Sequence, residues 1–189
     1  HFNGAGGNIA AGKYNDGSHE MRLILAERVA EGMKKAWENT RKYPIETADI
    51  KWLREPLLLP YNSKIAEVEN NMREKGNENY YISNFLSRYG WYERRKEGKS
   101  IETSCLMIGN ARLLFMPGEL FVEYQLAAKK MAPDKFVVMA AYGDYGPSYI
   151  GTKVAYDEGG YEIDASPVTS EAEKIIMNVI KNLLDKDDK

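Results

Sequence analysis

The sequence contains very few of the residues that build disulfides, metal centres and nucleophilic triads. Its single cysteine, Cys105, excludes an intrachain disulfide, and the apolar run around it predicts a buried, inert thiol. The only histidines are His1, at the chain end, and His19, at the polar start of a helix. Neither a Ser-His-Asp arrangement nor a Cys/His metal site can be assembled from them.

Neither sign of charge dominates, and no long apolar run is present. The 26 basic and 28 acidic residues give a net charge of −2, which offers no electrostatic basis for binding nucleic acid. No apolar stretch approaches the length of a membrane-spanning helix. Without internal repeats or low-complexity linkers, we expect one domain over residues 1–189.

Apolar periodicity predicts the secondary structure. Helical spacing marks residues 19–39, with Ser18 as the N-cap, then 63–75, 80–96 and a last helix from about residue 170. Extended segments are expected over residues 50–59, interrupted by Pro56, and over 101–108 and 113–115. A helix follows over roughly 119–131. The continuous apolar run 136–140 predicts a strand buried on both faces.

The series strand, helix, strand implies a parallel crossover, and hence an α/β fold with a mixed or parallel sheet flanked by helices. The glycine-rich loop at residues 4–12 leads into a helix, and such loops usually follow a strand. That strand would lie upstream of residue 1. We therefore expect the sheet to be incomplete because the N-terminal portion is absent, and the chain to be a fragment or processed product.

Ligands of open α/β sheets bind beyond the carboxyl ends of the strands, where three loops are expected to converge here. They are residues 4–12, 117–119 and 142–149. Glu119 is the first candidate carboxylate, because a Pro-Gly turn directs it and a helix N-terminus favours its charge; the alternative is an ordinary first-turn glutamate. The amides of the glycine loop could bind an oxyanion; the alternative is a turn that needs positive φ.

Several motifs, in the same order along the chain, resemble the neutral/alkaline ceramidase family. They are Phe2-Asn3-Gly4-Ala5-Gly6-Gly7-Asn8-Ile9, Leu114-Phe115-Met116-Pro117-Gly118-Glu119, Ser148-Tyr149-Ile150-Gly151-Thr152 and Tyr156-Asp157-Glu158-Gly159-Gly160-Tyr161-Glu162. The resemblance implies hydrolysis of the amide of N-acylsphingosine with one Zn²⁺, held by two histidines, a glutamate and a tyrosine. Glu119 and Tyr149 match the last two ligands, and Tyr149 is also the expected catalytic residue. Gly6, Gly7 and Asn8 are expected to bind substrate.

The resemblance is incomplete in two respects. The two histidine ligands belong to the family's N-terminal portion, so that portion of the same protein is the expected partner, together with a lipid-like amide substrate. Ala10 stands where the family's glycine loop carries a serine with an active-site role. Three interpretations stay open: a hydrolase that relies on activated water, a hydrolase of a different amide or ester, and a non-catalytic ligand-binding domain. By the same resemblance, a secreted or periplasmic location is expected.

Overall fold

The computed structural model describes residues 2–10, 12–65, 67, 81–143 and 146–186, with the backbone alone for residues 81–88. Its elements follow one another along the chain as α1 (His19–Glu38), the short 3₁₀ helix η1 (Thr47–Asp49), β1 (Ile50–Leu57), α3 (Tyr81–Lys96), β2 (Ile101–Ile108), β3 (Ala111–Pro117), β4 (Glu119–Leu120), α4 (Val122–Met131), β5 (Phe136–Gly143), β6 (Tyr149–Ile150), α5 (Lys153–Glu158), α6 (Tyr161–Asp164) and α7 (Ala172–Asp185).

Two sheets organise these elements. The larger has four strands in the order β1-β2-β3-β5, in which β1-β2 and β2-β3 are antiparallel and β3-β5 is parallel. The smaller is the parallel pair β4-β6, which continues from the end of the larger sheet. The predicted crossover is therefore present as β3-α4-β5. The predicted α/β fold, with a mixed sheet flanked by helices, is confirmed.

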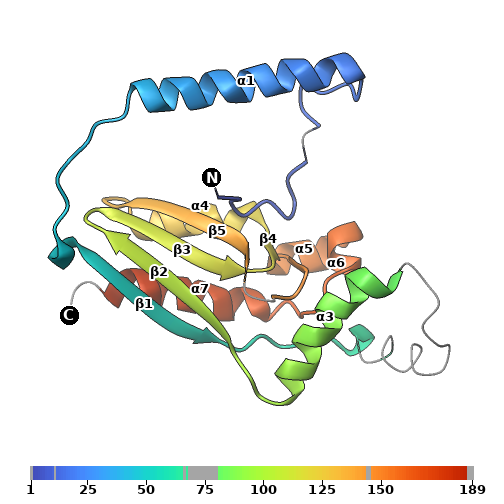
Figure 1. The fold of residues 1–189 in the computed structure, drawn as a ribbon. Coiled ribbons are helices and arrows are strands. Elements are labelled where there is room, and N and C mark those ends of the chain that lie inside the picture. Colours follow the sequence, from blue (N-terminus) through green and yellow to red (C-terminus); the bar gives the residue numbers. More distant parts are fainter. Residues whose placement is uncertain (1, 11, 66, 68–80, 144–145, 187–189) are drawn as a thin grey trace.

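One face of the four-stranded sheet, the inner face, packs against α4 and α7 (Figure 1). The strand register brings Cys105, Leu114 and Met139 into one row of this face, where all three are buried. The helices contribute buried side chains at helical spacing: Tyr124 and Ala128 from α4, and Ile176, Ile180 and Leu183 from α7. Burying each large apolar side chain stabilises the fold by about 1.5–3 kcal/mol.

The strand over 136–140 differs from its prediction. Val137 and Met139 are buried, but Phe136 is 67% exposed and Val138 and Ala140 are half-buried. The prediction that both faces are buried is wrong for the described residues. The physical reason is that β5 is an edge strand and the helices that cover it lie on the inner face only.

Two predicted boundaries are also wrong. The expected interruption at Pro56 is absent, because β1 is an edge strand, where a residue without an N–H group is tolerated. The helix expected from residue 119 begins at Val122. Glu119 and Leu120 instead pair with Tyr149 and Ile150, and this short ladder holds them extended.

Of the predicted helix 63–75, residues 66 and 68–75 lie outside the described residues.

Helix α1 agrees with its prediction but packs on nothing that the structure describes. Ser18 is its N-cap, and the Ser18 hydroxyl accepts a hydrogen bond from the Met21 N–H at 3.2 Å. No residue of α1 is buried, and Figure 1 shows the helix standing apart from the sheet. None of the described helices is long and apolar enough to cross a membrane.

Truncation of the central strand tests the inner core. Leu114 is fully buried, so Leu114→Ala leaves a cavity and is expected to lower the free energy of unfolding by about 2–5 kcal/mol. Leu126 of α4 is 49% exposed, and Leu126→Ala is expected to change the same quantity by no more than about 0.5 kcal/mol. Urea unfolding followed by circular dichroism measures both. Equal losses in the two variants would contradict this assignment of the core.

Candidate functional site

Three loops meet at the carboxyl ends of β3 and β5, as the sequence predicted. The Glu119 N–H donates to the Ser148 carbonyl at 2.9 Å, and the Tyr142 N–H donates to the Gly118 carbonyl at 2.8 Å. From the glycine loop, the Gly7 N–H donates to the Leu120 carbonyl at 2.9 Å. Main-chain hydrogen bonds therefore fix the positions of all three loops relative to one another.

The loops lie so close together that particular positions must be glycine. A Cβ atom on Gly7 would lie 2.4 Å from the Glu119 carbonyl oxygen, and one on Gly118 would lie 2.1 Å from the Pro147 carbonyl oxygen. Gly118 also has a φ of 68°, whereas no glycine of residues 4–12 has a positive φ. Within the glycine loop, close backbone approach therefore explains Gly7, and none of its glycines is explained by a positive φ.

Glu119 and Tyr149 are direct neighbours across the β4-β6 ladder, so their side chains project from the same face. The Tyr149 phenol lies within electrostatic reach of the Glu119 carboxylate. Partial burial and then the negative charge of Glu119 raise the pKa of Tyr149 above its usual value. The Ser148 hydroxyl lies 3.4 Å from Glu119 Oε1. Both site residues remain half-exposed, so a ligand can reach them.

Tyr142 is a third member of this group. It is the second-last residue of β5 and has a φ of 67°, a conformation that is strained for a bulky side chain. Its hydroxyl oxygen lies 3.5 Å from the point that a Cβ atom on Gly6 would occupy. Partial burial, followed by the charge of Glu119, raises the pKa of Tyr142 as well. The sequence of the loop 142–149 contains Tyr142, Tyr145 and Tyr149, but only the structure shows that Tyr142 lies beside the glycine loop.

The structure assigns different contacts to Gly6, Gly7 and Asn8. The Gly7 amide is engaged with Leu120, whereas those of Gly6 and Asn8 have no acceptor among the described residues. Asn8 Oδ1 accepts from the Val122 N–H at 2.9 Å, and Asn8 Nδ2 donates to Glu123 at 3.0 Å. Asn8 thus caps the start of α4, a role that sequence reasoning missed. Substrate binding by the three residues stays a prediction.

The donor set fits part of a zinc site. No group of three or more His, Cys, Asp or Glu side chains that could hold a metal ion occurs among the described residues. Glu119 and Tyr149 supply two adjacent oxygen donors, and a carboxylate is a common zinc ligand. Because zinc in proteins is almost always four-coordinate, the other ligands of such a site would have to come from outside the described residues.

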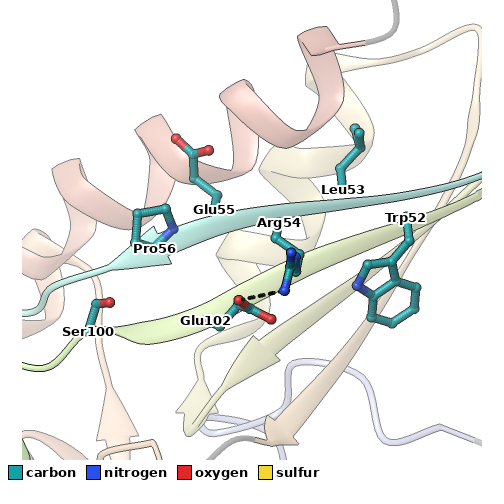
Figure 2. A pocket seen from close by; sticks show the side chains of 7 residues that line it. All are labelled: Trp52, Leu53, Arg54, Glu55, Pro56, Ser100 and Glu102. Atoms are coloured by element: carbon teal, nitrogen blue, oxygen red, sulfur yellow. Dashed lines mark hydrogen bonds and ion pairs between the residues drawn. The ribbon is translucent and has the colours of Figure 1, made fainter.

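A groove of about 450 Å³ lies elsewhere, along β1, where Arg54 and Glu102 form an ion pair at 3.4 Å (Figure 2). It is lined by Trp52, Leu53, Arg54, Glu55, Pro56, Ser100 and Glu102. None of these residues belongs to the three loops. The groove and the Glu119–Tyr149 pair are therefore separate features of the surface.

Substitution of Gly7 tests the close approach of the loops. In Gly7→Ala the new methyl group must displace the Glu119 backbone, so we expect the free energy of unfolding to fall by about 1–3 kcal/mol. Gly12 is the matched control, because no atom lies within 4 Å of its added Cβ. Gly12→Ala should be neutral or stabilise by up to about 1 kcal/mol. Thermal unfolding of both variants measures the difference, and equal effects would refute the packing argument.

The contact between Glu119 and Tyr149 has a measurable electrostatic signature. Glu119→Gln removes the negative charge that favours the neutral phenol, so the pKa of Tyr149 is expected to fall toward its usual value. The pKa of Tyr142 should fall in the same variant. Titration of ¹³C-labelled tyrosine by NMR, with Tyr149→Phe and Tyr142→Phe to assign the signals, measures both. A Tyr149 pKa that is unchanged by Glu119→Gln would show that the two groups do not interact.

Comparison with known proteins yields similarity in fold. No family model and no curated protein matches the chain. The crystal structure of neutral ceramidase from Pseudomonas aeruginosa matches 98% of this chain and 37% of that chain, with a TM-score of 0.56 at 15% identity. A ceramidase complexed with C2 matches 47% of this chain and 15% of that chain, with a TM-score of 0.39 at 18% identity. The chain thus shares its fold, over nearly its whole length, with 37% of the Pseudomonas enzyme.

Proposed function

We propose that this chain forms part of a zinc-dependent amide hydrolase similar to neutral ceramidase, which cleaves N-acylsphingosine or a related lipid amide. The observation that carries the proposal is the placement of Glu119 beside Tyr149 across the β4-β6 ladder, at the edge where three loops meet. The shared fold with a neutral ceramidase supports it. So do the sequence motifs, because two of them contain this glutamate and this tyrosine.

Glu119 and Tyr149 would hold the metal ion, together with ligands from outside the described residues. By family resemblance these further ligands are two histidines of an N-terminal portion. A Zn²⁺ ion bound there would supply Lewis acidity toward water and toward the scissile carbonyl.

The chain's own residues supply proton and hydrogen-bond donors. The Tyr149 phenol keeps its proton at neutral pH, as a phenol of ordinary pKa also does, and where it does not bind the metal ion it can donate a hydrogen bond to an oxygen that gains negative charge. The amides of Gly6 and Asn8, which have no acceptor among the described residues, are two further donors in the same region. Asn8 holds the loop against α4, and so fixes the direction of these amides.

A second candidate function is supported by Ala10. This exposed residue stands at the position of the family's serine, and its methyl group can neither attack a carbonyl nor donate a proton. A domain with the same fold could therefore bind a lipid amide without cleaving it. Cleavage of a different amide or ester by activated water is the third reading that Ala10 allows.

The decisive experiment measures zinc content and ceramide hydrolysis in the natural gene product. Glu119→Gln removes a charged ligand, so we expect bound zinc to fall well below one ion per chain and turnover to fall about 100-fold or more. Tyr149→Phe should lower turnover by a similar factor. Mass spectrometry of the metal and release of sphingosine measure the two quantities.

Two matched substitutions lie away from the site. Glu102→Gln changes an exposed carboxylate on β2, and Tyr43→Phe changes a tyrosine that is 73% exposed. Both variants should keep wild-type zinc content and turnover. Wild-type protein without zinc would refute the proposed function, whereas zinc without turnover would favour the lipid-binding domain.

A further inference from the structure

The face of the four-stranded sheet that points away from α4 and α7, here called the outer face, is mostly apolar. The strand register places fourteen residues on it in four rows: Ile50, Ile108, Ala111 and Phe136; Trp52, Leu106, Leu113 and Val138; Arg54, Ser104, Phe115 and Ala140; Pro56 and Glu102. Only Arg54, Ser104 and Glu102 are polar, and Arg54 and Glu102 form an ion pair at the edge of the face. A sheet face that meets water normally carries polar side chains, so this composition is typical of a covered face.

Aromatic rings gather near the middle of the outer face. The Trp52 and Phe115 ring centroids are 5.3 Å apart, and those of Phe2 and Phe115 are 6.1 Å apart. Nevertheless Trp52 is 54% exposed. Apolar area of this kind on a protein surface marks a binding site for another molecule.

Helix α1 presents a second bare apolar surface. Leu25, Val29, Met33 and Trp37 recur every four residues and form a stripe along it, here called the α1 stripe. Val29 is 62%, Met33 65% and Trp37 77% exposed. Extended segments lead from both ends of α1 toward the body of the protein (Figure 1). The helix is therefore placed where its apolar stripe can pack against a segment that is not among the described residues.

We propose that the outer face and the α1 stripe together form a docking surface for a segment of the same gene product that lies outside these 189 residues and adds a packed layer over the sheet and against α1. The fold itself supports a polypeptide occupant. It matches 98% of this chain but only 37% of the Pseudomonas enzyme, so in that structure the same fold is embedded in a longer chain.

The charges of α1 argue against a lipid surface. The helix carries four acidic and four basic side chains: Glu20, Glu27, Glu31 and Glu38; Arg22, Arg28, Lys34 and Lys35. Ion pairs join Glu31 to Lys35 at 3.2 Å and Lys34 to Glu38 at 3.9 Å. A helix that lies on a membrane carries an excess of Lys and Arg on its polar face. In α1 the basic and acidic side chains are equal in number, so there is no such excess.

Main-chain groups at β5 also favour a polypeptide. The strand is at the edge of the sheet, and the N–H of Ala141 already donates to the Asn3 carbonyl at 2.9 Å. An extended segment can therefore pair with the end of this edge. Only another polypeptide can continue such pairing, because lipid chains carry no hydrogen-bonding groups.

Cysteine footprinting of the natural gene product tests the docking surface. Val29→Cys places a thiol on the α1 stripe, and Phe136→Cys places one on the outer face at a side chain that is 67% exposed. Leu126→Cys, at a residue 49% exposed on α4, is the matched control outside the surface. Cys105 is expected not to react with the alkylating reagent, because burial raises its thiol pKa to about 11. Circular dichroism verifies that each variant folds.

If nothing covered the docking surface, the thiols of Val29→Cys and Phe136→Cys would react faster with iodoacetamide than that of Leu126→Cys, because their positions are more exposed. If a segment covers the surface, this order is reversed, and we expect both thiols to react at least about tenfold more slowly than the control. Faster reaction at both positions would overturn the proposal. So would protection that depends on protein concentration, with the mass of two copies, or protection that requires phosphatidylcholine vesicles. The test involves neither zinc nor turnover, so its outcome is independent of the proposed function.

Discussion

Main-chain packing between three loops is the constraint on which the candidate site depends. Gly7, Gly118 and Gly146 stand where one backbone passes so near another that a Cβ atom would approach main-chain atoms to 2.1–2.4 Å. The same contacts align β4 with β6, and that ladder sets Glu119 beside Tyr149. The positions of the Glu119 and Tyr149 side chains are therefore set by the packing of the backbone. Interactions between the two side chains contribute little to that packing.

This arrangement also explains the electrostatics of the site. A carboxylate and two phenols face one another in a region that is partly shielded from water, so the negative charge of Glu119 holds the protons on Tyr142 and Tyr149. A cation beside Glu119 would act in the opposite direction on both phenols. The protonation of these tyrosines would therefore be linked to any cation that is bound there.

The sequence predicted the parts of the fold that depend on local pattern. The helix over 19–39, the strands over 101–108 and 113–115 and the crossover β3-α4-β5 follow from apolar periodicity and turn residues, and the convergence of three loops follows from the crossover. It could not predict that Glu119 lies in a strand, because a two-residue ladder with Tyr149 is a non-local contact with no periodic signal. For the same reason the cap that Asn8 provides for α4 was missed. For the run 136–140, the local pattern led to a wrong prediction. Its continuous apolar residues predicted a strand buried on both faces, but in the part of the chain that the structure describes only the inner face of this strand is covered.

The cap on α4 has a consequence for how the site is assembled. The N-cap residue Phe121 has no side chain that can accept a hydrogen bond, and the acceptor for the Val122 N–H comes from Asn8, 114 residues before Val122. The first turn of α4 and the glycine loop therefore depend on each other, because this hydrogen bond joins a helix start to a loop that is distant in sequence. Loosening the N-terminal loop would leave the Val122 N–H without its acceptor, and would destabilise the start of the helix that follows Glu119.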